Sequence, residues 1–488
     1  MRLALPLCLA ALAVAARADE TPPLERTIAI HPAKPPTPAL SVRLLPSRAE
    51  QVPGDAAVFY HRAIESLIQL RYRELIQAGK SAADEASESP DYLAADWLRL
   101  PIDKFPRERV RKALDNRWTV LEEARLGSLR ETCDWGFRYR DEGYSLMLSE
   151  IQEMRSVARW LAVKARLDAD EGRVDEAVQD VRTGLAVARD VGRGDIYIQS
   201  LVAIACANLA LDELEDLIQK PGAPNLYWAL ATIPRPLIDL SGPAFGESVL
   251  LEREFPMLRK IDGDAWSLET ARACGDQFAR KLGQDVDGWP PARSPLTRPA
   301  VDDLPAHAVQ LLTIAKDYRR SKQALRDGGA PTDRVEAMPM IQVVGLDSYR
   351  AYQIASDEVV KWSHLPYWLG AKGWREAESR LLKLARGFPF VQLIPATRSA
   401  HAANVRLERR FAVLMVVEAV RLYAATHDGA LPPRLDDLTD APAPPDPITG
   451  KSFEYKLEGD RAFLSSPAPA GWEQVRESAI RYELRPAR

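Results

Sequence analysis

The sequence lacks the residue clusters on which most catalytic and metal sites depend. It has four cysteines and six histidines in 488 residues. No two cysteines share a CxxC spacing and no HExxH pair occurs, so neither a zinc site nor a dithiol redox site is expected. Nucleophile elbows of the GxSxG type, SxxK pairs and phosphate-binding GxxxxGK[ST] loops are also absent. The sequence therefore predicts no metal and no cofactor, and it favours a protein that is not an enzyme.

Long hydrophobic runs are scarce too. Residues 3–16 are uncharged, follow Arg2, and lead into the small residues Ala16 and Ala18. This run is shorter than the about 20 residues that a membrane-spanning helix needs. The pattern predicts a signal peptide over 1–18 that is cleaved between Ala18 and Asp19. We expect an extracytoplasmic protein, periplasmic or secreted, with no transmembrane anchor in the mature chain.

An excess of basic residues is missing as well. Without Arg2 and Arg17 of the signal peptide, 63 basic residues face 69 acidic ones, which gives a net charge of about −6. Nucleic acids and anionic lipids attract proteins through clustered basic charge. The overall balance therefore predicts no nucleic-acid partner and no polybasic attraction to anionic lipid.

Three cysteines remain after signal cleavage, too few for a scaffold held by many disulfides. Cys206 lies in the apolar stretch 201–211, and we expect it to be buried as a small hydrophobic residue. If the chain has a disulfide, Cys133 and Cys274 are the pair to test.

Proline spacing and hydrophobic periodicity divide the chain into segments. Residues 21–53 hold eight prolines, which exclude a helix, and residues 283–305 hold five. We expect a signal peptide over 1–18, a proline-rich extended linker over 19–54, a helical domain over 55–258, an irregular connection over 259–305, a second helical region over 306–395, and a small α+β tail over 396–488.

The fold class that follows is mainly α. Irregular helical hairpins are joined to a small C-terminal α+β unit made of one long helix and a short antiparallel sheet. The apolar residues recur at helical spacing in several stretches, and we expect helices over 56–78, 150–170, 174–191, 196–219, 226–233, 306–326, 348–362, 374–385 and 406–426. Residues 411–417 are apolar on every face of the last helix, so protein must cover them. The strands expected after it are 453–457, 462–465 and 480–484.

The hairpin over 150–191 resembles one tetratricopeptide-like unit. Ala165, Gly172 and Ala177 carry the resemblance, because they fall at the small-residue positions of that helix pair, and residues 172–177 form the turn. The resemblance implies a helical hairpin that offers a concave surface to a partner.

The last 85 residues or so resemble the globular head of type II secretion pseudopilins of the G type. The resemblance rests on Tyr423, Pro432, Leu435, Leu438, Asp446, Pro447, Gly450, Tyr455, Gly459, Leu464 and Ser465. It implies the fold of the tail but not the family's calcium site, and we consider this tail as a second docking module of an interaction protein. It is not extended to pilus assembly, because the tail follows a large helical domain instead of an N-terminal assembly helix.

Three further runs resemble an uncharacterised family of exported bacterial helical proteins. These runs are Cys133-Asp134-Trp135-Gly136, residues 161–167 and residues 221–230. The resemblance implies an exported chain with this order of segments, and it implies no particular activity.

One group of residues is a candidate binding surface. Asn225, Tyr227 and Trp228 are followed by Arg235 and Asp239. Tyrosine, tryptophan and arginine are enriched where proteins bind partners, so the group could line a groove for a peptide or a glycan. The alternative is that Tyr227 and Trp228 pack a short helix onto its neighbours.

A group of acids is the other candidate. Asp212, Glu215 and Asp216 share one helix face at i, i+3 and i+4. Such a group could perform acid–base catalysis if burial separated the pKa values of its members. We expect instead a solvated helix face.

Three functions fit these features. The first is an exported non-catalytic interaction or scaffold protein, with a protein or an envelope glycan as partner. The second is an extracytoplasmic hydrolase or glycan-active protein that uses unrecognised acidic residues. The third is a protein associated with the secretion apparatus.

Overall fold

The computed structural model describes residues 24–77, 90–139, 146, 148–286, 306–384, 395–473, 475 and 478–487. The predicted signal peptide and residues 287–305 of the predicted loop lie outside this part of the chain. The described chain is mainly helical with a small sheet near its C-terminus, as the sequence predicts.

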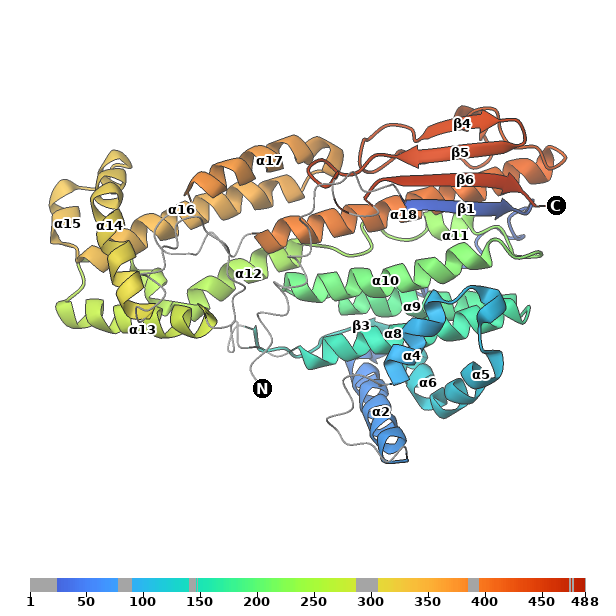
Figure 1. Cartoon of the computed structure of the whole chain (residues 1–488), viewed down its shortest axis with the longest axis horizontal. Helices are drawn as coiled ribbons and strands as arrows, with labels where there is room; N and C mark the ends of the chain where they lie inside the picture. The colour runs from blue at the N-terminus through green and yellow to red at the C-terminus, as the bar shows by residue number, and fades with distance from the viewer. Residues whose placement is uncertain are drawn as a thin grey trace. The chain divides into compact units, whose positions relative to one another are not determined.

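The chain forms two compact units (Figure 1). Within the described residues, the larger unit lies in 24–136, 148–242 and 400–487, and the smaller unit lies in 137–146 and 243–399. The α+β tail therefore belongs to the same unit as the first helical domain, although the two were predicted to be separate domains. The reason is that strands and helices from both ends of the chain share one core.

The larger unit contains most of the secondary structure. Its elements are β1 (Leu24–Ile30), β2 (Val52–Asp55), α2 (Ala56–Gln77), α4 (Pro90–Arg99), η2 (Ile102–Lys104), α5 (Arg107–Asn116), α6 (Trp118–Ser128), β3 (Arg130–Thr132), α8 (Ser149–Asp170), α9 (Val174–Val191), α10 (Tyr197–Leu217), α11 (Tyr227–Ala231), α18 (Pro395–Thr426, from residue 400 on), η7 (Leu435–Asp437), β4 (Glu454–Glu458), β5 (Arg461–Ser466) and β6 (Ile480–Pro486).

Helices α8, α9 and α10 pack on one another and form the centre of this unit. The turn between α8 and α9 is possible because Gly172 has a φ of 78°, which a side chain would disfavour. Among the described residues, α10 is the one helix long and apolar enough to cross a membrane, but two thirds of its most apolar window are buried. Its composition thus suits the core of a three-helix bundle.

The far side of α8 is also covered. Helices α2, α4, α5 and α6 pack against it. Helix α2 starts as predicted after Asp55, whose carboxylate accepts a hydrogen bond from the amide of Ala57 at 3.0 Å. The side of α8 opposite the bundle is therefore occupied by the chain itself.

A four-stranded sheet lies beside the bundle, in the order β1-β6-β5-β4 (Figure 1). The antiparallel strands β4, β5 and β6 agree with the prediction. Strand β1 pairs parallel to β6, so the sheet is mixed rather than antiparallel. The proline-rich segment predicted as a linker is thus part of the core, because Ile28 and Ile30 are almost completely buried. A second, two-stranded sheet pairs β2 with β3.

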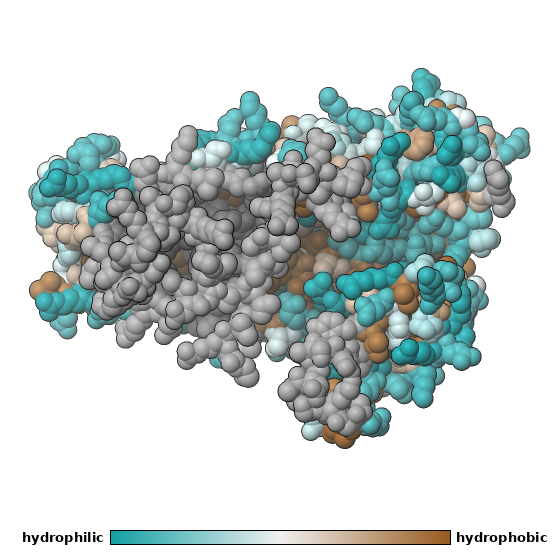
Figure 2. Space-filling view, viewed as in Figure 1, coloured by the Kyte–Doolittle hydropathy of each residue, from teal (hydrophilic) through white to brown (hydrophobic). Residues whose placement is uncertain are grey.

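The two faces of the four-stranded sheet differ in polarity. One face carries buried residues such as Leu464, Tyr482 and Leu484, and the other carries mainly charged and polar residues such as Thr27 and Glu483, together with Phe463. The space-filling view shows mainly hydrophilic surface over β4 and β5 (Figure 2). Helix α18 runs along the sheet, and its apolar residues 411–417 are buried except Met415, as expected for a helix covered by protein.

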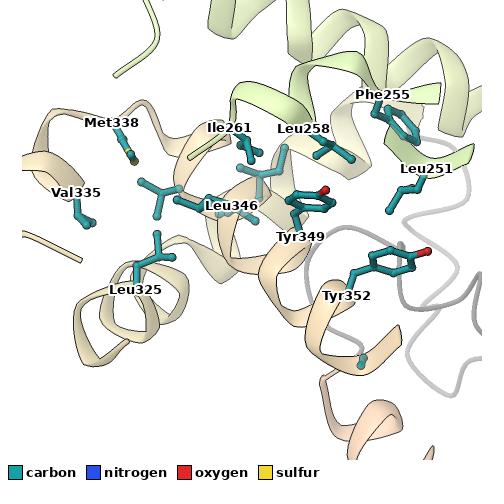
Figure 3. Close-up of a cluster of buried hydrophobic side chains, with 14 of the residues drawn as sticks. Leu251, Phe255, Leu258, Ile261, Leu325, Val335, Met338, Leu346, Tyr349 and Tyr352 are labelled. Carbon is teal, nitrogen blue, oxygen red and sulfur yellow. The ribbon is translucent and has the colours of Figure 1, made fainter. Parts of the chain in front are cut away.

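The smaller unit is helical in the described residues. It contains α12 (Ser241–Glu254, from residue 243 on), η4 (Pro256–Lys260), α13 (Leu268–Val286), α14 (Ala306–Asp327), α15 (Thr332–Ala337), α16 (Met340–Ser363) and α17 (Tyr367–Leu384). The prediction of an irregular connection over 259–305 is wrong for α13. In the core of this unit, Tyr349 and Tyr352 of α16 lie toward Leu251, Phe255 and Leu258 (Figure 3).

Candidate functional site

The predicted binding residues lie where the bundle meets the C-terminal helix of the same unit. Asn225 is buried, and its side-chain amide donates a hydrogen bond to the carbonyl of Glu418 in α18 at 2.7 Å. Its oxygen accepts a bond from the amide of Tyr227, the first residue of the short helix α11, at 3.1 Å. Asn225 therefore joins two parts of the chain and is inaccessible to a ligand.

Tyr227 is also an internal contact. Its side chain is buried, and its hydroxyl donates to the carbonyl of Pro442 at 2.7 Å. Trp228 is half-buried and meets the Tyr227 ring edge-on, with 5.1 Å between the ring centroids. For Tyr227 the structure thus agrees with the alternative that the residue packs α11 onto its neighbours.

Arg235 and Asp239 make different contacts. The guanidinium of Arg235 lies 3.9 Å from the centre of the Phe411 ring and 3.4 Å from the carboxylate of Glu408, both in α18. Asp239 is exposed and accepts hydrogen bonds from the amide and the hydroxyl of Ser241. The five predicted residues therefore do not line one groove, and a binding role for Trp228 or Arg235 stays a prediction.

A buried ion pair secures α18 beside these residues. Glu418 and Arg421 are fully buried, and their charged atoms lie 2.7 Å apart. The Arg421 guanidinium also donates to the backbone carbonyls of three residues far away in the sequence, namely His31, Ala223 and Pro224. Burial raises the pKa of Glu418 to about 7, against the opposing effect of Arg421. This arginine joins the N-terminal segment, the loop before α11 and the C-terminal helix at one point.

The acids of α10 contradict the prediction of a solvated helix face. The side chain of Glu215 is 2% exposed and lies 2.6 Å from the guanidinium of Arg26 in β1. Its other oxygen accepts a hydrogen bond from the hydroxyl of Tyr482 in β6 at 3.0 Å. Only Asp216 keeps a side chain that is more than half exposed. The prediction fails because the residues that cover Glu215 come from strands far away in the sequence.

Arg410 completes this cluster from α18. It lies 2.8 Å from Asp212 and 3.8 Å from Glu215. It also donates to the backbone carbonyl and the side-chain oxygen of Asn208. We call Arg26, Asp212, Glu215, Arg410 and Tyr482 the charge cluster. Burial raises the pKa of Glu215, whereas Arg410 and Arg26 oppose that rise.

The charge cluster pairs each carboxylate with arginine, as a structural ion pair does. A general acid or base needs access to a substrate and a pKa tuned for proton transfer. Here two carboxylates face two arginines and a tyrosine that come from β1, α18 and β6. The cluster can therefore hold four elements together, and no site for a reacting molecule is visible between them.

A crevice between α8, α9 and α10 also contains acids. It is lined by small and apolar residues together with Cys206, Asp180 and Glu213, and it has no room for a water molecule. Burial raises the pKa of Asp180 to about 7 and that of Glu213 to about 8. Both carboxylates have cationic partners, Lys164 at 2.8 Å and Arg166 at 2.9 Å. The crevice is part of the packed bundle and cannot admit a substrate.

The run Cys133-Asp134-Trp135-Gly136 is held by contacts to α2 and α9. Trp135 stacks on Tyr60, and its indole nitrogen donates to the backbone carbonyl of Asp190 at 3.0 Å. Burial, followed by the nearby Asp190 and Asp55 carboxylates, raises the pKa of the Cys133 thiol. A thiolate nucleophile is disfavoured at this position.

The structure does not contain the disulfide considered between Cys133 and Cys274. Both thiols are free, as is that of Cys206, which is buried as expected. Cys133 belongs to the larger unit and Cys274 to the smaller one. Within the described part of the chain, no three His, Cys, Asp or Glu side chains are placed to hold a metal ion. That the protein uses no metal or cofactor stays a prediction.

Arg26, Arg410 and Tyr482 were not predicted as site residues. One signal was present for Arg26, because alternation along β1 places it on the same face as the buried Ile28 and Ile30. Nothing local in the sequence shows that α10 supplies its partner. No protein-family model matches this chain, and neither a curated protein nor a solved structure matches it.

Proposed function

We propose that the chain is an exported interaction or scaffold protein without catalytic activity. The observation that carries this proposal is that the buried acids are paired with arginines inside the larger unit. Glu215, Glu213 and Glu418 each face an arginine in the core, and the described crevice admits no water. Residues that could have formed an acid–base site are committed to holding the larger unit together. Export follows from the signal-peptide pattern and is part of the proposal.

The partner surface in this proposal is on α2. Ile68, Tyr72 and Ile76 follow one another at i, i+4 and i+8, and each is exposed. They form an apolar stripe on the side of α2 that faces away from α6 and α8. Charged residues of both signs, Glu65 and Arg73, flank the stripe. We call the three residues the α2 stripe.

An amphipathic helix of a partner protein is the occupant that fits the α2 stripe. Such helices bind through apolar residues repeated every three or four positions, and flanking charges set their orientation. The larger unit supplies the rigid support, because the opposite side of α2 packs on α6 and α8. Binding of a helix to the α2 stripe does not require a concave surface on the tetratricopeptide-like hairpin α8–α9. Other helices of this chain already pack against α8 and α9.

The test is an interaction measurement with matched variants. Ile68→Glu combined with Ile76→Glu adds charge to the stripe. Gln69→Glu is the control, because it adds charge at an exposed position of the same helix outside the stripe. The double variant should lose a protein that wild type and Gln69→Glu both capture from envelope extract. The purified partner should then reproduce the difference in direct binding. Equal binding by all three proteins would contradict the proposal.

A further inference from the structure

The hairpin between α16 and α17 ends in apolar side chains that point outward. Leu365, Trp368 and Leu369 are 43%, 47% and 50% exposed. They lie within five successive positions, at the turn and in the first turn of α17. We call these three residues the hairpin tip. Single exposed apolar residues are common on protein surfaces, but a cluster of this kind marks an interaction site.

The exposure of Trp368 contrasts with that of its neighbours. The indole nitrogen of Trp374 donates to the carbonyl of Val359 at 2.7 Å, so this ring turns toward α16. Trp362 packs against Gly373, where a Cβ atom would collide with the indole ring. Trp362 and Trp374 thus pack between the two helices of the hairpin, whereas the side chain of Trp368 is partly exposed.

Basic residues follow the tip along the exposed face of α17. Lys372 lies one turn behind Trp368 and Leu369, and Arg375 lies a further turn behind; both are exposed. One helical turn spans about 5.4 Å. Residues 359–375 contain no acid, so the first acids on either side are Glu358 and Glu376. The polarity along this face therefore changes from apolar to cationic within about two turns.

We propose that the hairpin tip docks the protein on the surface of an anionic phospholipid membrane. Exposed leucine and tryptophan at the turn of a helical hairpin suit the boundary between headgroups and acyl chains. Lys372 and Arg375 then lie at the level of the lipid phosphates, where basic side chains are attracted and can extend toward the headgroups. The overall negative charge of the chain does not oppose this, since charges farther away than about 10 Å are screened by salt.

A membrane fits the tip better than a protein groove does. Basic residues lie one and two helical turns behind the exposed apolar ones, and this spacing matches a bilayer, in which the phosphates lie outside the acyl chains. Lys361 is paired with Glu358, so the attraction rests on Lys372 and Arg375. The inference goes beyond the proposed function, because it concerns the smaller unit and a lipid partner.

Flotation of the purified mature chain, residues 19–488, with vesicles tests the inference. Vesicles of phosphatidylglycerol and phosphatidylcholine should bind the wild type, and raising the salt from 50 to about 500 mM should weaken binding. Trp368→Ala combined with Leu369→Ser should weaken it at least tenfold, and so should Lys372→Glu combined with Arg375→Glu. Vesicles of phosphatidylcholine alone should bind every protein weakly.

Trp118→Ala is the matched control. Trp118 is 66% exposed but lies on α6 of the larger unit, so its replacement should leave vesicle binding unchanged. Thermal unfolding of each variant checks that the exposed substitutions leave the fold intact. Failure of the wild type to bind anionic vesicles would overturn the inference, as would full binding by the tip variant or an equal loss with Trp118→Ala. A tip that binds a purified envelope protein but ignores vesicles would also overturn it.

Discussion

The guanidinium of Arg26 lies 2.6 Å from the carboxylate of Glu215, although the two residues are 189 positions apart. This pair connects the first strand of the described chain to helix α10 of the bundle. Tyr482 of β6 and Arg410 of α18 bind the same carboxylate from other sides. The unity of the larger unit therefore depends on charged contacts between distant segments as well as on apolar packing.

Glu215→Gln should destabilise the larger unit by about 1–3 kcal/mol. The substitution keeps the shape of the side chain but leaves Arg26 and Arg410 with less negative charge in a buried setting. Asp216→Asn makes the same change from carboxylate to amide on a side chain that is 52% exposed, and it should change stability by less than about 0.5 kcal/mol. Urea unfolding followed by circular dichroism compares the two. An effect of Glu215→Gln as small as that expected for Asp216→Asn would show that the charge of Glu215 adds no stability.

Arg421→Met should cost more, about 3–5 kcal/mol. It would leave the Glu418 carboxylate buried without its cation, and three backbone carbonyls would lose their donor. Arg434→Met is the matched control, because Arg434 makes a similar i,i+3 pair with Asp437 at the surface. The unfolding midpoint should fall for Arg421→Met alone. An equal fall of the midpoint in both variants would mean that burial of the Glu418–Arg421 pair is not the cause of its contribution to stability.

Strand β1 offers two adjacent positions with opposite environments. Ile28 is 1% exposed and lies opposite Leu484 in β6, whereas Thr27 is exposed on the other face. Ile28→Ala should destabilise the larger unit by about 2–4 kcal/mol through the cavity that it leaves. Thr27→Ala should stay within about 0.5 kcal/mol. If β1 were a linker, as the sequence first indicated, the two substitutions would have the same small effect in thermal unfolding.

These positions also show how far the sequence could predict the fold. The helices α2, α8, α9 and α10 follow directly from apolar spacing and from stop signals such as Gly172. Strand β1 was missed because eight prolines in residues 21–53 hide an alternation of only seven residues. Its pairing with β6 joins the two ends of the chain, and no local pattern encodes such a contact.

The candidate site, too, could be predicted only in part from the sequence. The sequence identified Asn225 and Tyr227 as notable, but only the structure shows that they face α18 rather than a ligand. The three acids on α10 were visible as a group. Their burial could not be predicted, because Arg26, Arg410 and Tyr482 lie 186 or more positions away from them.

Stability should depend on pH through Asp180. Burial raises the pKa of Asp180 to about 7 in the folded protein, whereas its ordinary value is 3.8. The folded state thus favours the protonated carboxyl, so this group's contribution to stability is full below about pH 4 and is lost as the pH rises through 7. Lys164 and Asp168, which face Asp180, act in opposite directions on the same equilibrium.

Asp180→Asn should reduce this part of the pH dependence. Asparagine stays neutral, so the loss of stability between pH 5 and pH 8 should be smaller in the variant than in the wild type. The exposed Asp175→Asn, in the first turn of the same helix, serves as the control. Urea unfolding at both pH values measures the difference. An identical pH dependence in all three proteins would show that Asp180 is ionised throughout this range.

Alkylation separates free thiols from a disulfide. The structure has Cys133, Cys206 and Cys274 as free thiols, so unfolding residues 19–488, which lack Cys8, in urea without a reductant should let all three react with iodoacetamide. In the folded protein at pH 7, Cys133 should react slowly, because burial and the carboxylates of Asp190 and Asp55 raise the pKa of its thiol and keep the thiolate scarce. Intact mass spectrometry counts the labels. Only one label on the unfolded, unreduced chain would show that two of the cysteines are paired, and peptide mapping would then decide whether they are Cys133 and Cys274.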